Sequence, residues 1–484
     1  MQGRTSTGGG AGFSTRLAMR GVAPPAAAVL AFLAALSTRL LNDGDSWWHV
    51  AAGRLMIARR AVIHSDPFSY TFAGAAWHTH EWLAQILLGG AFGVGGWSAV
   101  VILTAAAMGL TAWLLGRDLS RWVDGLPLLC LVALGLGLGT GSLLARPHML
   151  ALPILEIWTA ELIRARAEAR SPRWIVLPLM ALWANLHGSF MFGLALIGPF
   201  ALEALLAAPS FGARRDVVLR WGTFGLAAAA MAVISPDGVG TLLFPIQLLG
   251  MKSLAHIGEW APASFATVGP LEVALLATLF VAITRPLRLP VIRALLLLLL
   301  LYLALQHTRY EQMLGVIGAL ILAAPMARAF GQGADAAASG ERPARTPILT
   351  TAALSIALLL AAGRLAWPVV LGDDVDRPAS ALAAVPAATR QTHVLNEYSF
   401  GGYLIGHGVA PFIDSRADLY GDAWLEAYDR LIRPDRAALA ATLDARQIGW
   451  TLFKAGSPVA DAMDEMPGWR RLYADRWAVV HVRR

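Results

Sequence analysis

The distribution of hydrophobic and polar residues predicts a chain that crosses a membrane many times. Apolar runs of about 20 residues, the length that a helix needs to span a bilayer, recur along the chain. The shorter alternating segments that are typical of a membrane barrel are not found. We therefore predict helical spans at residues 22–41, 97–116, 126–144, 148–163, 174–189, 190–208, 219–235, 270–285, 289–306, 313–330 and 348–367.

Two segments leave alternatives open. Residues 82–96 are apolar, but the segment is short and glycines interrupt it, so it is interfacial, re-entrant or a short span. The number of spans is therefore about 11 to 13. The run at 22–41 would also suit a long signal peptide, although the many spans that follow favour a retained helix.

Composition agrees with a membrane protein. Of the 484 residues, 57% are hydrophobic and 15% are charged, against about 25% charged in an average soluble domain. The net charge of +7 comes mostly from arginines at the ends of apolar runs, so we expect no nucleic-acid partner. Cys130 is the single cysteine, which excludes an intrachain disulfide and a cysteine metal cluster.

Arginine positions predict how the spans are oriented. With eleven spans, the arginine-rich connections all fall on one side, which the positive-inside rule makes cytoplasmic. These connections carry Arg117/Arg121, Arg164/Arg166/Arg170/Arg173, Arg214/Arg215/Arg220, Arg285/Arg288 and Arg342/Arg345. We therefore expect a cytoplasmic tail at 1–21, a membrane domain at 22–367 with a large external loop at 42–81, and an extracytoplasmic domain at 368–484.

The first external loop concentrates titratable groups. The segment Asn42-Asp43-Gly44-Asp45-Ser46-Trp47-Trp48-His49 places two carboxylates beside a membrane helix, a costly position unless they meet water, a cation or a substrate. We predict a surface helix over 46–60 that Asp45 or Ser46 caps. The same loop also carries His49, Asp66, His78, His80 and Glu81. In the alternative readings the aspartates only cap that helix, or the histidines bind zinc.

Three further polar groups lie at the external ends of apolar runs. Arg146 and Arg309 stand where basic residues are rare, which favours an anionic ligand such as phosphate. Pairing with a carboxylate, Glu259 or Glu311, is the alternative. His187, within the segment 183–188, either packs in a turn between two helices or faces a cavity.

Several of these segments together resemble a bacterial branch of the GT-C glycosyltransferase superfamily, which includes protein O-mannosyltransferases, aminoarabinose transferases and the catalytic subunit of oligosaccharyltransferase. The segments are 43–49, 66–71, 77–82, 183–188 and the helix end at Arg309, and the likeness covers roughly residues 20–330. Its members have many spans, a large first external loop and an essential acidic residue shortly after the first helix. Here His80-Glu81-Trp82 stands where many mannosyltransferase-like members have Glu-Lys-Pro-Pro.

The resemblance implies a glycosyltransferase of the bacterial inner membrane that moves a sugar from a polyprenyl-phosphate donor to an external lipid, glycan or protein. In an inverting transfer, a carboxylate removes the hydroxyl proton of the acceptor while the sugar carbon gains oxocarbenium character. We predict Asp45 as this base, with Asp43 as the second candidate. The departing phosphate would be stabilised by Arg309, by Arg146 or by a divalent ion (Mg²⁺ or Mn²⁺) on the two aspartates. Further substrate contacts are predicted for His49, Asp66, His78, His80, Glu81, His187, Glu259 and His307.

The pattern changes near residue 392 to short β-rich runs that alternate with helical ones. We predict strands at 393–396, 411–413, 448–453 and 477–482, and helices at 423–432, 436–445 and 458–466. This alternation indicates a small α/β domain with some parallel pairing. Asp414, Arg416 and Asp418 follow a predicted strand, where such domains often place ligands, and a structural Asp–Arg pairing is the alternative.

Two other functions compete with the transferase. One is a multi-span transporter or flippase of lipid-linked glycans, and the other is a non-catalytic envelope-assembly protein. The internal repeat or paired broken helices expected of a transporter are not obvious, and the asymmetric loop and appended domain favour the enzyme. P-loop, GxGxxG, zincin and GxSxG motifs are absent, which disfavours ATP-driven transport, dehydrogenation and α/β-hydrolase chemistry.

Overall fold

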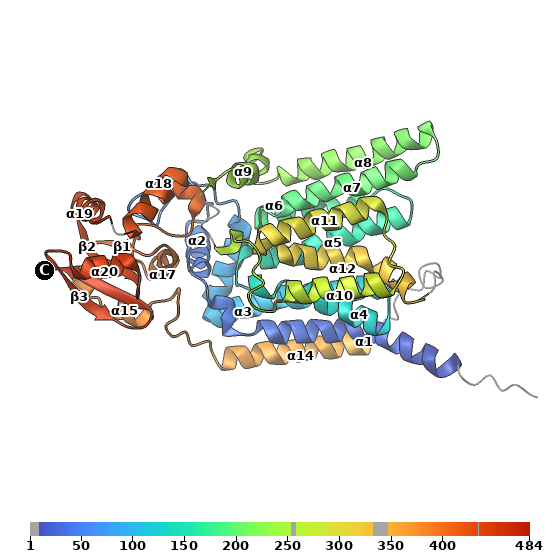
Figure 1. Cartoon of the computed structure of the whole chain (residues 1–484), viewed down its shortest axis with the longest axis horizontal. Helices are drawn as coiled ribbons and strands as arrows, with labels where there is room; N and C mark the ends of the chain where they lie inside the picture. The colour runs from blue at the N-terminus through green and yellow to red at the C-terminus, as the bar shows by residue number, and fades with distance from the viewer. Residues whose placement is uncertain (1–8, 253–257, 333–346, 434) are drawn as a thin grey trace, which may run out of the picture.

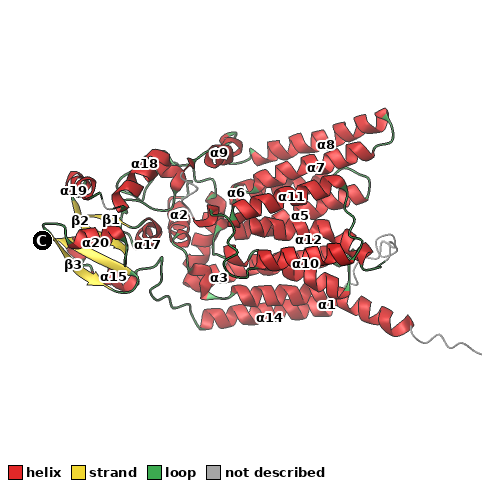
Figure 2. Ribbon diagram, viewed as in Figure 1, coloured by secondary structure: helices red, strands yellow, loops and turns green. Residues whose placement is uncertain are grey.

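The chain forms a long helical bundle with a smaller α/β part at its C-terminal end (Figures 1 and 2). The structure is a computed structural model, and it describes residues 9–252, 258–332, 347–433 and 435–484. Side chains are described from residue 21 onward within these ranges, except that of residue 259. The first helix begins inside the predicted tail at 1–21, of which residues 1–8 lie outside the described ranges.

Each apolar run that we predicted to span the membrane coincides with a helix. These helices are α1 (Gly9–Ala35), α3 (Trp82–Leu119), α4 (Gly125–Gly137), α5 (Pro147–Ala167), α6 (Leu177–Leu186), α7 (Phe190–Ala207), α8 (Phe211–Ala232), α10 (Pro270–Thr284), α11 (Val291–Gln306), α12 (Glu311–Ala329) and α14 (Pro347–Ala366). Within the described ranges, 5 helical segments are long and apolar enough to cross a membrane, and shorter apolar helices accompany them. The predicted polytopic helical membrane protein is confirmed.

The segment 82–96 is the first part of α3 and lies across one end of the bundle. Its start is fixed by Trp82, whose indole N–H donates to the Asn185 side chain at the end of α6 (2.6 Å). Its other end, Gly95, abuts Leu365 at the end of α14, and the backbone leaves helical geometry there. Both ends therefore lie at the end of the bundle from which α14 leads to the C-terminal part. This placement does not fit a separate short span and agrees with both the interfacial and the re-entrant alternatives.

The C-terminal part is a mixed sheet with helices. Strands β1 (His393–Asn396), β2 (Ile448–Lys454), β3 (Trp469–Ala474) and β4 (Ala478–Arg483) lie in the order β1-β2-β4-β3. β1 and β2 pair in parallel, and the other neighbours are antiparallel. The helices are α15 (Ala379–Ala384), α16 (Ala387–Arg390), α17 (Gly401–Gly406), α18 (Ala417–Ile432), α19 (Arg436–Ala445) and α20 (Pro458–Asp464). The predicted small α/β domain with some parallel pairing is confirmed.

The strand predicted at 411–413 is wrong. The side chain of Asn396 takes the place of a partner strand, because its oxygen accepts from the Phe412 backbone N–H and its nitrogen donates to the Ile413 carbonyl (both 2.8 Å). This apolar run is therefore a buried irregular segment. In contrast, β3 was missed, since its two arginines and a register shift between Arg471 and Tyr473 hide the alternation.

The first external loop forms the interface with the C-terminal part. Arg416 donates to Asp66 at 2.7 Å and, through two nitrogens, to Asp414 at 2.8 and 2.7 Å. All three side chains are fully buried, and the Trp77 ring covers the guanidinium at 4.6 Å. We call Asp66, Arg416 and Asp414 the brace. Asp66, predicted to bind substrate, has no accessible surface for one, and the structural pairing predicted as the alternative for Asp414 and Arg416 is what forms.

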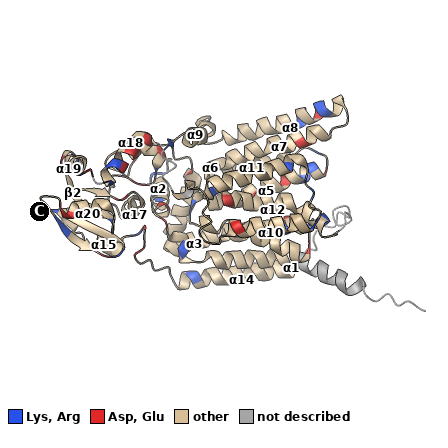
Figure 3. Cartoon of the chain, in the orientation of Figure 1, with Lys and Arg blue, Asp and Glu red and all other residues tan. Residues whose placement is uncertain are grey.

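Charged residues also gather at the opposite end of the bundle, away from the C-terminal part (Figure 3). Ion pairs join helices there, such as Arg293 of α11 with Glu203 of α7 at 2.9 Å and Arg166 of α5 with Glu203 at 3.5 Å. This grouping agrees with the predicted placement of the arginine-rich connections on one side. Arg342 and Arg345 lie outside the described residues.

Candidate functional site

Asp43 and Arg146 fix the start of helix α2 (Asp45–Arg59). The Asp43 carboxylate accepts from the backbone N–H groups of Asp45 and Ser46 (both 3.2 Å), so Asp43 caps the helix in place of the predicted Asp45 or Ser46. Arg146 precedes α5 and donates to both Asp43 oxygens, at 2.7 and 2.5 Å. Burial alone would raise the pKa of Asp43, but Arg146 outweighs it and the pKa falls below its usual value. Asp43 is therefore an ionised group held by Arg146.

Gly44, between the two aspartates, allows the C-terminal part to approach. A side chain at this position would begin only 2.4 Å from the Ser399 carbonyl oxygen, and one on Gly402 only 2.0 Å from the Gly44 carbonyl oxygen. Neither clash involves a flexible group that can move away. The Asp-Gly-Asp spacing thus brings the second aspartate against the segment Tyr398–Phe400, which is the short helix η7.

Asp45 lies on the exposed side of this arrangement. Its carboxylate meets Arg146 at 3.1 Å and accepts a hydrogen bond from the Ser415 hydroxyl, which itself accepts from the Trp48 indole N–H at 3.0 Å. Its side chain remains 17% accessible. Burial, reinforced by neighbouring Asp43 and opposed by Arg146, raises the pKa of Asp45 to about 6. A carboxylate with this proton affinity suits general base catalysis near neutral pH.

Asp45 opens into a cavity of about 310 Å³ between the bundle and the C-terminal part, which we call the acid chamber. On one side its walls come from Asp43, Gly44, Asp45, Arg146, Leu248, Gly258, Trp260 and Arg309. On the other side they come from Asp376, Tyr398, Ser399, Ser415, Ala417 and Asp418. The chamber is therefore complete only when the C-terminal part is docked.

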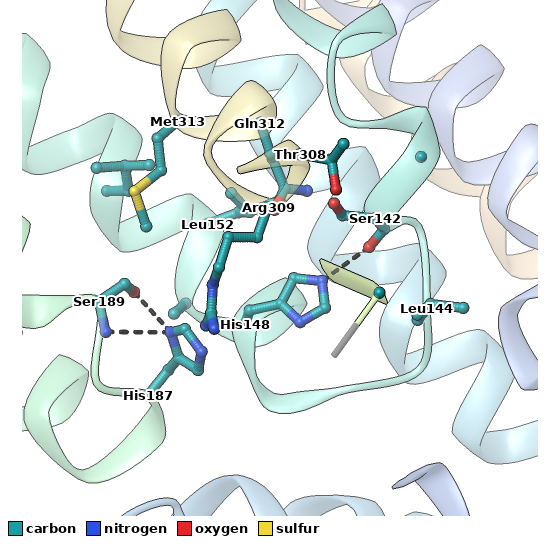
Figure 4. Close-up of a pocket in the computed structure, with 14 residues that line it drawn as sticks. Ser142, Leu144, His148, Leu152, His187, Ser189, Thr308, Arg309, Gln312 and Met313 are labelled. Atoms are coloured by element: carbon teal, nitrogen blue, oxygen red, sulfur yellow. Dashed lines mark hydrogen bonds between the residues drawn. The ribbon is translucent and has the colours of Figure 1, made fainter. Parts of the chain in front are cut away.

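A second cavity of about 210 Å³ adjoins the acid chamber, and we call it the histidine chamber (Figure 4). Arg309 and Gly258 line both cavities. Figure 4 shows the Arg309 side chain reaching toward His187, with His148 on its other side. The Arg309 guanidinium also lies over the Trp260 ring at 4.4 Å. A cation shared by two adjoining cavities is placed to bind an anionic group that lies between them.

The imidazoles of this region have defined roles in hydrogen bonding. His148 Nε2 donates to the Ser142 carbonyl oxygen at 2.8 Å. His187 Nδ1 accepts from the Ser189 backbone N–H at 3.1 Å, so a neutral His187 carries its proton on Nε2. That nitrogen faces Glu81 at 3.5 Å.

Glu81 is a buried carboxylate surrounded by imidazoles. Besides His187, it has His80 at 3.7 Å and His49 at 3.8 Å, distances too long for direct hydrogen bonds. Burial raises the pKa of Glu81, although His80 opposes it, and burial lowers the pKa of His49 well below its usual value. Glu81, His80 and His49 lie behind His187, and none of these three residues lines either chamber.

The structure divides the predicted site residues into three groups. Those that line a chamber are Asp43, Asp45, Arg146, His187 and Arg309. Those that stand behind His187 are His49, His80 and Glu81. Those placed elsewhere are Asp66 in the brace, His78, which is 61% exposed beside Asp237, and His307, whose Nδ1 donates to the Trp260 carbonyl. The side chain of Glu259 lies outside the described residues.

Sequence reasoning missed other lining residues, chiefly His148, Gln312, Tyr398, Ser399 and Ser415. His148 directly follows Arg146-Pro147, so the external position of Arg146 was a signal for it. Ser415 is separated from Asp45 by 370 positions along the chain. No local pattern joins residues at that distance, and the docking of the C-terminal part alone brings them together.

The two aspartates do not suit the divalent ion that we considered for them. Oxygens of both carboxylates face Arg146, and Asp43 also accepts from backbone N–H groups, which leaves no pair of free oxygens for a hard cation. Across the described ranges, no group of three or more His, Cys, Asp or Glu side chains is arranged to hold a metal. The guanidinium of Arg146 occupies the position between the carboxylates.

Comparison with known structures identifies the fold. The chain matches the archaeal oligosaccharyltransferase AglB from Archaeoglobus fulgidus, in complex with an inhibitory peptide and a dolichol-phosphate, with a TM-score of 0.53 and 11% identity over 89% of this chain and 69% of that one. It also matches the apo oligosaccharyltransferase of Archaeoglobus fulgidus (TM-score 0.49, 12% identity, 89% and 69% covered). ArnT from Cupriavidus metallidurans bound to undecaprenyl phosphate matches with a TM-score of 0.48 and 13% identity, over 94% and 96%.

No family model and no curated protein sequence matches the chain. At this identity the likeness establishes the fold alone. It is the fold of the archaeal oligosaccharyltransferase, which agrees with the resemblance that the sequence segments indicated.

Proposed function

We propose that the protein is a membrane glycosyltransferase that moves a sugar from a polyprenyl-phosphate donor to an acceptor hydroxyl group. The observation that carries this proposal is the pair of adjoining chambers: Asp45, a carboxylate with a pKa of about 6, faces one of them, and Arg309 lines both. A base and a phosphate-binding cation are the two groups that an inverting transfer needs. The fold is shared with an archaeal oligosaccharyltransferase whose structure holds a dolichol-phosphate.

The proposed reaction assigns one role to each group. The acceptor hydroxyl loses its proton to Asp45 as its oxygen forms a bond to the anomeric carbon, and the bond from that carbon to the phosphate oxygen breaks with both electrons leaving on the phosphate. Arg309 stabilises the negative charge of the departing polyprenyl phosphate. Arg146 keeps Asp43 ionised and contacts Asp45. Asp43 in turn caps the helix that begins with Asp45, so Asp43 is a positioning residue. We write these steps without a metal ion.

The lipid donor explains why the site lies at one end of a helical bundle. A polyprenyl chain remains in the bilayer while its phosphate reaches the surface, where Arg309 and the histidine chamber lie. Under the positive-inside rule this end faces outward, so the C-terminal part is extracytoplasmic, as expected for an enzyme of the bacterial inner membrane.

Replacing Asp45 tests the proposal. The purified chain in nanodiscs, supplied with radiolabelled undecaprenyl-phosphate sugars, is expected to release free undecaprenyl phosphate. Asp45→Asn keeps the size of the side chain and removes the base, so release should fall at least 100-fold. Asp444→Asn, an exposed acid on the C-terminal part, is the control and should keep full activity.

Three outcomes would contradict the proposal. Wild-type turnover by a folded Asp45→Asn protein would exclude Asp45 as the base. Movement of lipid-linked sugar across the membrane without bond cleavage would support a transporter, and binding without cleavage or movement would support an assembly protein.

A further inference from the structure

Two hydroxyl groups in the acid chamber are buried without a partner. Tyr398 Oη and Ser399 Oγ have almost no accessible surface, and neither has a hydrogen-bond partner among the described residues. Both residues line the chamber from the C-terminal part. A buried hydroxyl that bonds to nothing costs free energy, so its presence beside a cavity points to a ligand that completes it.

The segment that carries these hydroxyls is rigidly held. The Tyr398 backbone N–H donates to the Tyr428 hydroxyl at 3.0 Å, and that hydroxyl donates to the Asn396 carbonyl at 3.1 Å. The Ser399 carbonyl packs directly on Gly44, next to Asp45. The backbone that carries the two hydroxyls is therefore fixed beside the proposed base, and both hydroxyls are buried away from solvent.

Asp418 supplies a second carboxylate on the same wall. It accepts from the Trp77 indole N–H at 3.2 Å and lines the acid chamber beside Ser415 and Ala417. Burial raises the pKa of Asp418, and burial together with Asp45 raises the pKa of Tyr398 well above its usual value, so Tyr398 stays protonated and able to donate. The wall thus offers two hydroxyls and a carboxylate around one small cavity.

We propose that this wall, formed by Tyr398, Ser399 and Asp418, is the acceptor subsite and that it binds a saccharide. The inference rests on the proposed function and names the acceptor class of the same site. Hydroxyls and carboxylates in fixed positions complement the closely spaced hydroxyls of a sugar, each of which both donates and accepts. A sugar hydroxyl bound here lies next to Asp45, which removes its proton.

The other acceptor classes fit the chamber less well. A peptide strand needs main-chain partners or a long groove, whereas the chamber is a compact space of about 310 Å³ with few apolar residues. A phosphorylated lipid headgroup would meet the carboxylates of Asp45, Asp376 and Asp418. An uncharged, hydroxyl-rich acceptor avoids both problems.

Saccharide binding by the full chain in nanodiscs tests the proposal, with a panel of methyl hexosides and neutral disaccharides followed by saturation-transfer NMR. The wild type is expected to bind at least one of these probes. Tyr398→Phe and Ser399→Ala each remove one hydroxyl and keep the surrounding packing, and each should weaken binding about tenfold. Tyr473→Phe is the matched control, because Tyr473 lies in β3 and its hydroxyl bonds to Asp475 in the turn between β3 and β4, and it should bind like the wild type.

Binding of undecaprenyl phosphate, measured on the same variants by native mass spectrometry, separates this inference from the proposed function. Both variants should bind the lipid phosphate as the wild type does. No saccharide binding by a protein that binds the lipid phosphate would overturn the acceptor subsite alone, as would equal binding by wild type and Tyr398→Phe. Tyr398-dependent binding of a serine-containing peptide would overturn the saccharide class. Saccharide binding without any lipid phosphate binding would contradict the proposed function and leave this wall as a sugar site.

Discussion

The protein contains two arrangements in which one arginine lies between two aspartates, and they differ in accessibility. In the brace, Arg416 joins Asp66 and Asp414, and no atom of these side chains is exposed. At the site, Arg146 joins Asp43 and Asp45, and the latter keeps 17% of its side chain accessible. The same residue types thus form a fully buried structural contact in the brace and a partly accessible pair with a reactive carboxylate at the site.

The difference teaches that the accessibility of a carboxylate and its share of the arginine distinguish a functional aspartate from a structural one. Arg416 bonds to both of its partners at 2.7–2.8 Å, so each charge is compensated. Arg146 is shared unequally, since it bonds to both oxygens of Asp43 at 2.7 and 2.5 Å and meets an oxygen of Asp45 at 3.1 Å. Burial, which Arg146 opposes without offsetting it, raises the pKa of Asp45 to about 6, and the side chain keeps a face toward the cavity.

Breaking the brace should produce the largest effect. Arg416→Leu leaves the buried carboxylates of Asp66 and Asp414 without a compensating cation, which should cost about 3–5 kcal/mol and detach the C-terminal part from the first loop. Thermal unfolding and limited proteolysis of the purified protein would measure this loss. Adding Asp66→Asn and Asp414→Asn removes the stranded charges and should restore part of the stability.

A surface ion pair provides the control for the brace. Arg471 pairs with Asp464 on the C-terminal part, and its side chain is 50% exposed. Arg471→Leu should change stability by less than about 1 kcal/mol, because water compensates for the lost pair. An Arg416→Leu protein that is as stable as Arg471→Leu would show that the brace does not hold the two parts together.

The contact at Gly44 should have the next largest effect. Gly44→Ala pushes a methyl group against the Ser399 carbonyl and should cost about 1–3 kcal/mol while separating Asp45 from Ser415. Gly198→Ala is the matched control, since Gly198 lies in α7 with open space beside it. Unfolding curves for the two variants, with sugar transfer measured in parallel, check this. Equal stability and activity would mean that the close approach at Gly44 is not required.

Much of the fold could be predicted because it depends on local patterns. Each apolar run long enough to span a membrane is a helix, and the ends of α19 at Arg436 and Ala445 were predicted to the residue. Predictions failed where a side chain replaced a backbone partner, as Asn396 does for the segment 411–413. They also failed in β3, where charged residues interrupt the alternation.

Only half of the candidate site could be predicted, because the other half comes from a distant part of the chain. The motif at 43–49 identified the two aspartates, and the external positions of Arg146 and Arg309 identified the cations. The sequence favoured Asp45 over Asp43 only by its place beside the predicted helix, and the physical distinction depends on how Arg146 is shared. Likewise, Asp66 resembled the other acids of the loop, and only its burial against Arg416 shows that it is structural.

The pH dependence of transfer should follow the protonation of Asp45 at the site and not that of the aspartates in the brace. Asp45 acts as a base only when it is ionised, and its pKa is raised to about 6, so activity should be constant above that pH and fall about tenfold per unit below it. Transfer rates between pH 4.5 and 8, with folding checked at each pH, measure this limb. A limb centred near pH 4, the usual value for an aspartate, would mean that the burial of Asp45 has no effect on catalysis.

The smallest predicted effect concerns Ser415, the group of the C-terminal part that bonds to Asp45. Its hydroxyl favours the ionised form of Asp45, so Ser415→Ala should move the acid limb upward by about one pH unit while leaving the rate at pH 8 nearly unchanged. Ser415→Thr keeps the hydroxyl and should restore the wild-type limb. Ser399→Ala lies in the same chamber without bonding to Asp45, so its limb should not move. If all three variants share the wild-type limb, the pKa of Asp45 is set by the first loop and Arg146 alone. The C-terminal part then contributes to substrate binding but not to the pKa of the base.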